Sequence, residues 1–184
     1  MSMLETLSPT SLEFIRILEP RAILDEIGFS LETSSDRTTP HIRMGLRFAE
    51  ERLVQSKFGS VRGLHYQLML PRATLLRVVS GSIFFAAVDL RRSSPEFGLA
   101  TCVEITEESR QALWAPEGYA CGYMSLYDDT KVLAKFSEYE EPALMRTLLW
   151  NDPDLRIPWP EIGHAFVTER DGAGMRLRAL ETYD

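Results

Sequence analysis

The chain has 184 residues, 45% of them hydrophobic and 26% charged, and both fractions are those of ordinary globular proteins. This length suffices for one domain with a real core, so we expect residues 1–184 to form a single domain. The net charge of −7 argues against nucleic acid or an anionic membrane surface as the main partner, although a few local arginines still suffice to hold a phosphate.

Two cysteines, Cys102 and Cys121, predict reduced thiols in a cytoplasmic protein, with one disulfide bridge as the alternative. No apolar run reaches the roughly 18 residues that a membrane span needs. The first residues have no basic region ahead of a hydrophobic segment, as a signal peptide would. We therefore expect a cytoplasmic protein that does not enter a membrane.

The predicted elements begin with two weak helical signals, Ser11–Phe14 and Thr38–Arg47, of which the second is equally compatible with a loop. Strand patterns follow from Gly63 onward, bounded by turn residues. The predicted strands are Gly63–Leu70, Thr74–Val79, Ser82–Leu90, Leu99–Ile105, Gln111–Trp114, Ala120–Tyr127 and Lys131–Tyr139.

Two pairs of turn residues separate neighbouring strands in this series. Ser80 with Gly81, and Asp128 with Asp129, are typical of two-residue hairpins. Strands at this spacing predict an antiparallel sandwich or barrel. The Pro-rich section that begins at Asp152 is expected to wrap around that barrel.

One strand carries an unusual group of polar residues within the segment 60–67. Arg62, His65 and Gln67 place a cation, an imidazole and an amide within six residues of an otherwise apolar run. Because alternate strand residues face the same side, His65 and Gln67 are expected to project together. Polar groups are costly to bury without partners, so this trio predicts a polar pocket, with a structural histidine as the alternative.

The other candidates for chemistry are weaker. The three histidines are at positions 41, 65 and 164 and include no His-x-His pair, so we expect no metal ion and no other cofactor. Five aromatic residues are either core or a platform for a nucleobase, namely Trp114, Tyr119, Tyr123, Tyr139 and Trp150.

Five segments, in order and spacing, resemble the dTDP-4-dehydrorhamnose 3,5-epimerase family. They are residues 25–32 (DEIGFSLE), 61–67 (VRGLHYQ), 87–98 (AVDLR with SPEFG), 114–119 (WAPEGY) and 150–155 (WNDPDL). The resemblance runs from about Pro20 to Asp171. It implies an all-β, antiparallel jelly-roll (cupin) barrel with short peripheral helices. It also implies epimerisation of a dTDP-linked, or other nucleotide-linked, 4-keto-6-deoxy sugar for a surface polysaccharide or a secondary metabolite.

The resemblance also implies roles for individual residues. His65 matches the catalytic base and Asp171 its carboxylate partner, a pair that sequence separation alone leaves open. The implied substrate-binding residues are Arg62, Gln67, Glu32 and Tyr139. Basic neighbours such as Arg52 or Lys57 are expected to join Arg62 at the diphosphate. Family members are commonly homodimers that exchange an N-terminal strand, so a homodimer is expected here.

Four positions depart from the family pattern. They are Ile27 in place of an Arg, Thr74 in place of a Lys, Cys121 in place of a His, and Ala134 in place of the proton-donating Tyr. Tyr139 lies five residues beyond Ala134 and so has the opposite strand parity, and Glu140 replaces a further aromatic residue.

These departures bear directly on the chemistry. Epimerisation beside a ketone needs a base, a donor for the enolate oxygen, and an acid on the opposite face. The chain keeps the base and loses the other two groups, unless Tyr123, Cys121 or Lys135 substitutes. Three functions therefore remain open: an epimerase of altered scope, a nucleotide-sugar binder without the reaction, and different chemistry in a cupin barrel.

Overall fold

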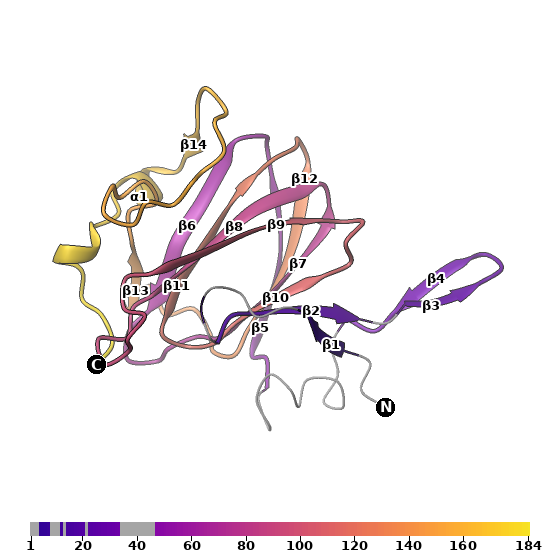
Figure 1. The fold of residues 1–184 in the computed structure, drawn as a ribbon, viewed down its shortest axis with the longest axis horizontal. Helices are drawn as coiled ribbons and strands as arrows, with labels where there is room; N and C mark the ends of the chain where they lie inside the picture. The colour runs from indigo at the N-terminus through magenta and orange to yellow at the C-terminus, as the bar shows by residue number, and fades with distance from the viewer. Residues whose placement is uncertain (1–3, 8–11, 13, 21, 34–46) are drawn as a thin grey trace.

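The computed structural model describes residues 4–7, 12, 14–20, 22–33 and 47–184. Two large sheets face each other, and a two-stranded hairpin extends away from both (Figure 1). We call the first sheet sheet I. Its strands, in spatial order, are β1 (Leu4–Leu7), β2 (Arg16–Pro20), β10 (Ala112–Ala115), β7 (Thr74–Ser80), β12 (Thr130–Phe136) and β5 (Glu50–Ser56).

The second sheet, sheet II, has the order β13 (Met145–Thr147), β6 (Ser60–Gln67), β11 (Tyr119–Ser125), β8 (Ser82–Asp89) and β9 (Ala100–Thr106). A short strand, β14 (Phe166–Val167), pairs with β6 in parallel, whereas the pairs within this order are antiparallel. The separate hairpin consists of β3 (Ala22–Asp25) and β4 (Gly28–Leu31). The predicted all-β jelly-roll barrel is confirmed.

The two predicted hairpins are wrong. β7 ends at Ser80 and β8 begins directly after Gly81, but the two strands belong to different sheets. β11 and β12, on either side of Asp128 and Asp129, also belong to different sheets. Both turns carry the chain from one sheet to the other, because each sheet is completed by strands distant in sequence. Turn residues signal a reversal of direction but not whether the two strands bond to each other.

The predicted strands are all present, with ends displaced by a few residues. The largest changes are that β6 begins at Ser60 and ends at Gln67, and that β12 ends at Phe136. Tyr139 therefore lies beyond the strand, and the parity argument that placed it on β12 does not apply. Strands before Gly63 were not predicted, because β5, for example, is mostly exposed and shows no clear alternation.

The described residues of the first weak helical signal are not helical, and the second signal falls almost wholly outside the described residues. Leu12 is in a bend and Phe14 in a turn, while Ser11, Glu13 and residues 38–46 lie outside the described residues. The short peripheral helices are α1 (Glu169–Gly172) and a 3₁₀ turn, η1 (Leu177–Ala179).

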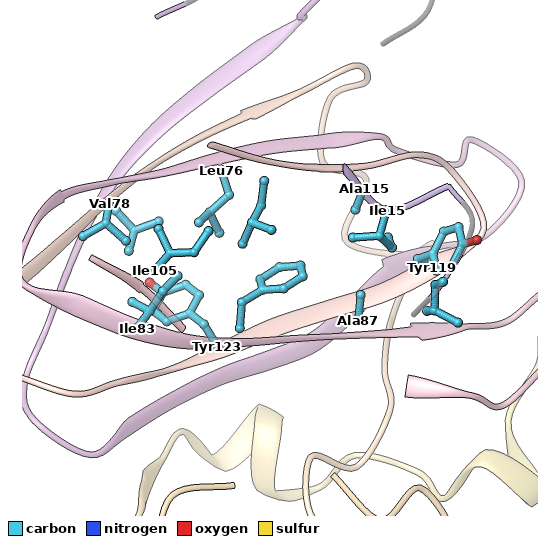
Figure 2. Close-up of a cluster of buried hydrophobic side chains, with 13 residues drawn as sticks. Ile15, Leu76, Val78, Ile83, Ala87, Ile105, Ala115, Tyr119 and Tyr123 are labelled. Carbon is cyan, nitrogen blue, oxygen red and sulfur yellow. The ribbon is translucent and has the colours of Figure 1, made fainter. Parts of the chain in front are cut away.

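The main core fills the space between the two sheets. Figure 2 shows Leu76 and Val78 of sheet I facing Ile83 and Ala87 of sheet II, with Tyr123 among them. Tyr119 and Tyr123 belong to this core, and Trp114 is buried in a smaller cluster that includes Leu18 and Leu75. Trp150 packs against Trp159, so these four aromatic residues serve packing.

The C-terminal section covers the outer face of sheet II, as the sequence predicts. Leu155 and Leu180 are buried against Leu64 and Tyr66 of β6. Asp171, on α1, is brought against the same strand and is 2% exposed. This wrapping places a residue of the last quarter of the chain beside His65.

Candidate active site

A bulge in β6 aims Arg62 and His65 at the same side of sheet II. His65 lies opposite Cys121 and Arg62 opposite Tyr123, so three steps along β6 match two along β11. The extra residue changes the strand parity, which lets residues three apart face the same cavity. Gly63 makes this possible: its φ is +105°, and a Cβ there would lie 2.6 Å from the carbonyl oxygen of Cys121.

His65 forms a close pair with Asp171. Its Nε2 lies 2.5 Å from Asp171 Oδ1, and Asp171 Oδ2 accepts a hydrogen bond of 3.2 Å from the Gly63 amide. Thr168 caps α1 by accepting a hydrogen bond from the amide of Asp171, which fixes the carboxylate locally. Burial alone would raise the pKa of Asp171, but its hydrogen bonds from His65 and Gly63 lower it overall. His65 and Asp171 therefore lie within hydrogen-bonding distance, as expected, and the catalytic role of the pair stays a prediction.

His65 faces a cavity of about 280 Å³ between the two sheets. The Asp171 side chain is 3% exposed and lies behind the imidazole, which is 31% exposed. The residues that line the cavity are Arg52, Val54, Arg62, His65, Arg72, Thr74, Leu76, Phe85, Cys121, Gly122, Tyr123, Val132, Ala134, Phe136, Glu140, Met145 and Arg170.

The wall that sheet I contributes is largely apolar. Ala134 and Phe136 of β12 pair with Leu76 and Thr74 of β7, and all four line the cavity across from the sheet that carries His65. Among the described residues on this wall, arginine is the only titratable type, and a guanidinium stays protonated. Thr74 and Ala134 therefore lie where a cation and an acid would face the base.

Lys135, Tyr123 and Cys121 were the possible substitutes for the missing acid, and none of them is placed to donate a proton from the wall that sheet I contributes. Lys135 pairs with Glu51 at 3.2 Å and does not line the cavity. Tyr123 lines it, but its hydroxyl oxygen is buried and burial raises the pKa of the phenol. Cys121 is next to His65 on the same sheet, and burial raises the pKa of its thiol to about 12. The thiol is therefore protonated near neutral pH.

The lining of the cavity is strongly basic. Four arginines and one glutamate line it, in a chain whose net charge is −7. Glu140 binds Arg52 at 2.6 Å, Arg72 at 3.5 Å and Arg170 at 3.7 Å. Burial would raise the pKa of Glu140, but these arginines lower it, so the carboxylate is ionised. These arginines favour an anionic group of a ligand in the cavity.

Arg62 belongs to this basic lining and is held by two hydrogen bonds. Its Nε donates to Ser56 Oγ at 2.8 Å and its Nη2 to the carbonyl of Gln55 at 3.2 Å. Lys57 is exposed and is absent from the cavity lining. Of the two basic neighbours that were expected beside Arg62, the structure thus brings Arg52 to the cavity.

The remaining predicted binding residues lie elsewhere. Gln67 is 1% exposed. Its side-chain nitrogen donates to the carbonyls of Leu70 and Tyr139, and its side-chain oxygen accepts a hydrogen bond from the backbone amide of Glu141. The Tyr139 side chain is 65% exposed. Glu32 follows β4, and Ile27, at the tip of the hairpin, is 97% exposed. None of the four lines the cavity, and the roles of Gln67, Tyr139 and Glu32 in binding stay predictions.

Arg72 and Arg170 were missed by the sequence reasoning. Arg72 lies two residues before Thr74, and strand alternation extended back from β7 was the signal that could have found it. Within the described ranges, no three His, Cys, Asp or Glu side chains gather into a metal-binding group. Nor does any described helix have the length and apolar character that crossing a membrane requires.

The jelly-roll barrel, with a histidine–carboxylate pair at the wall of a basic cavity, places the chain among the cupin-fold proteins. Residues 9–179 match the family model of dTDP-4-dehydrorhamnose 3,5-epimerase. An epimerase of that name from Methanothermobacter thermautotrophicus is 35% identical over 176 residues, which cover 95% of each chain. The chain belongs to the dTDP-4-dehydrorhamnose 3,5-epimerase family.

Solved structures agree with this assignment. An epimerase from Legionella pneumophila, in complex with dTDP-4-keto-L-rhamnose, has a TM-score of 0.92 and 29% identity, covering 97% of this chain and 95% of its own. A 3'-monoepimerase from Streptomyces bikiniensis, in complex with dTDP-quinovose, has a TM-score of 0.84 and 27% identity, covering 94% of this chain and 88% of its own.

Proposed function

We propose that this protein binds a dTDP-linked 4-keto-6-deoxy sugar and removes a proton from a carbon next to the ketone. The observation that carries the proposal is the His65–Asp171 pair at the wall of a basic cavity. Arginines with exposed side chains at the edge of the cavity, Arg52 and Arg170, fit a diphosphate. The neighbouring family members that bind dTDP-linked sugars support this class of ligand.

The hydrogen bond to Asp171 prepares His65 to act as a base. A carboxylate can only accept, so Nε2 carries the proton and Nδ1 keeps its lone pair. Asp171 also stabilises the imidazolium that forms when Nδ1 takes a proton. The same nitrogen can return that proton, or a deuteron gained from solvent, to the face from which it was taken.

The apolar wall limits the reaction. Leu76, Val132 and Ala134 offer no proton to the opposite face of the sugar. Losing a general acid typically costs a factor of about 10²–10⁴ in rate. We therefore propose slow exchange at one carbon with little inversion, rather than rapid epimerisation at two carbons.

The decisive experiment is solvent-deuterium incorporation into a dTDP-4-keto-6-deoxy sugar, measured by mass spectrometry. We expect uptake at one carbon, lost in His65→Ala. His164→Ala is the matched control, because His164 packs edge-to-face against Phe166 and does not line the cavity. Rapid inversion at both carbons by the unmodified protein would show that another group supplies the acid.

A second function is a nucleotide-sugar binder without chemistry, which the apolar wall around Ala134 favours. Calorimetry with dTDP, and with GDP and CDP for comparison, separates the two when it is combined with the exchange measurement. Binding of a nucleotide without any exchange supports the binder. No heat and no thermal shift with any of the three at millimolar concentration would remove both functions.

We further propose that residues 1–184 act as one domain in a homodimer. The β3–β4 hairpin extends away from the barrel (Figure 1) and exposes a group of large apolar side chains. They are Ile23, Leu24, Ile27 and Phe29, each more than half exposed. A second copy of the chain is the partner that the family resemblance favours.

A further inference from the structure

One of the arginines that line the cavity, Arg72, is deeply buried in its wall. Arg72 lies just before β7, in the same alternating row as Thr74 and Leu76, and all three line the cavity. Its side chain is only 6% exposed. A charge this deeply buried is costly unless other groups compensate it.

The contacts of Arg72 supply charge but few close hydrogen bonds. Its Nη1 lies 3.5 Å from Glu140, and its Nη2 lies 3.5 Å from Glu50. Both distances are at the outer limit of a hydrogen bond. Within the described part of the chain, its buried Nε has no hydrogen-bond partner. A guanidinium has five N–H donors, so this one keeps donors for an oxygen that enters the cavity.

Packing fixes where those donors lie. The guanidinium carbon is 3.9 Å from the centre of the Phe136 ring, which lines the cavity from β12. Nη1 also lies 3.9 Å from the sulfur of Met145. Met145 is on β13, where it pairs with Gln67, and Thr147 of the same strand pairs with His65. Arg72 thus extends from sheet I toward the strand pair that carries the base.

We propose that Arg72 is the catalytic residue that stabilises the enolate oxygen formed when His65 removes a proton. This inference rests on the proposed function. His65 Nδ1 takes the proton, the C–H electron pair becomes a carbon–carbon double bond, and the carbonyl π pair moves to oxygen. N–H groups of Arg72 donate to that negative oxygen until the electrons return and the carbon is reprotonated.

Glu50 and Glu140 hold Arg72 in position. Both carboxylates also bind Arg52, whose side chain is 45% exposed at the edge of the cavity. Glu50 in turn accepts a hydrogen bond of 3.0 Å from the amide of Glu140. Arg52→Gln therefore loosens the same network without removing the buried guanidinium, which makes it the matched comparison for Arg72→Gln.

The first measurement is the rate constant of solvent-deuterium exchange at saturating dTDP-4-keto-6-deoxy sugar. Arg72→Gln is expected to lower it about 10²–10³-fold, as the loss of an oxyanion donor does, while the Kd for dTDP stays within about twofold. Arg52→Gln should mainly weaken the binding of dTDP, and it should lower the exchange rate constant by less than about tenfold. Arg178→Gln, an exposed position outside the cavity, controls for loss of a positive charge.

Several outcomes would overturn the assignment. An exchange rate in Arg72→Gln equal to that of the wild-type protein would do so. An equal loss of exchange rate in Arg52→Gln would also do so, because it would assign the effect to the ion pairs with Glu50 and Glu140. If Arg72→Gln does not fold, as judged by circular dichroism, Arg72→Lys decides. A lysine keeps the charge but not the planar donors, so we expect about a tenfold slower reaction, and an unchanged rate would contradict the proposal.

A binding experiment separates this inference from the proposed function. If the wild-type protein shows no exchange, the proposed function fails, and Arg72 is then judged by calorimetry. Arg72→Gln should weaken the binding of the 4-keto sugar nucleotide about tenfold and leave the affinity for dTDP unchanged, because the guanidinium contacts the ketone oxygen. Equal weakening of both ligands would assign Arg72 to the diphosphate, and no change in either would remove its role.

Discussion

At the scale of single residues, the charge of Asp171 supports both His65 and the backbone of β6. The carboxylate accepts hydrogen bonds from the imidazole and from the Gly63 amide, and these lower its pKa in the folded protein. A carboxyl group with a lowered folded pKa stabilises the fold above its unfolded pKa, and this contribution is lost as the pH falls through the folded value. The pair therefore links the chemistry to acid stability.

Asp171→Asn tests this link. At about pH 7, we expect a loss of about 1–3 kcal/mol in the free energy of unfolding, because buried hydrogen bonds to a charge are weakened. The difference should begin to shrink at about pH 3.5, because the carboxyl of the unfolded chain, which has an ordinary pKa, is then becoming protonated. Urea denaturation at both pH values measures it. A difference of the same size at both would show that the charge contributes nothing.

A second residue-scale prediction concerns the apolar wall. Ala134 is 7% exposed and faces the cavity from the sheet opposite His65. Ala134→Tyr, combined with Thr74→Lys and Cys121→His, would place an acid and two cationic groups around the sugar. We expect the inverted product to increase at least tenfold, read by NMR after exchange in D₂O. The triple variant with His65→Ala is the control and should remain inactive.

The sequence predicted this site only in part. The pair of His65 with Asp171 followed from the family resemblance, because 106 residues separate them and no local pattern joins them. The bulge that turns Arg62 toward the same cavity depends on how β6 pairs with β11, which the sequence of β6 alone does not contain. Arg72 was missed because its compensating partners, Glu50 and Glu140, come from other parts of the chain.

At the scale of elements, strands were predictable where they alternate or lie between clear turn residues. β7, β8 and β9 were found to within one residue at each end, while β5 was not, because its exposed edge position removes the alternation. The partners of each strand were not predictable, since pairing in a jelly roll joins segments distant in sequence. This is why both hairpin predictions failed.

Gly81, at the crossing from β7 to β8, provides a test of this connection. Its φ is +84°, and a Cβ there would lie 2.5 Å from Thr130 Oγ1. Gly81→Ala is therefore expected to cost about 2–4 kcal/mol, from backbone strain and the clash together. Gly163→Ala is the control: its φ is +72°, but no atom lies within 4 Å, so only the strain remains. Urea denaturation compares the two, and equal losses would mean that the crossing tolerates a side chain.

At the scale of the whole molecule, the hairpin is the part least accounted for by the barrel. Its strands pair only with each other in the described structure, and its apolar side chains face outward. Apolar surface of this kind is a common mark of a protein interface. A homodimer would give these side chains a partner.

Leu24→Glu tests the homodimer. Leu24 is 73% exposed on β3, and a charge there would be costly to bury in an interface. We expect the wild-type protein to elute as a dimer, and the variant as a monomer, in size-exclusion chromatography with light scattering. Leu53→Glu, at a leucine 63% exposed on β5, is the control and should remain dimeric. A monomeric wild-type protein would contradict the proposal.

The crossings at Ser80–Gly81 and Asp128–Asp129 also bear on how the protein folds. Because the strands from β5 to β8, and again from β9 to β13, alternate between the two sheets, neither sheet can complete itself from one continuous stretch of chain. Folding must close long loops before strand contacts repay the lost entropy, which places such topologies on a timescale of about milliseconds to seconds. The two sheets should accordingly gain amide protection from hydrogen exchange together, and the cavity between them exists only once both have formed.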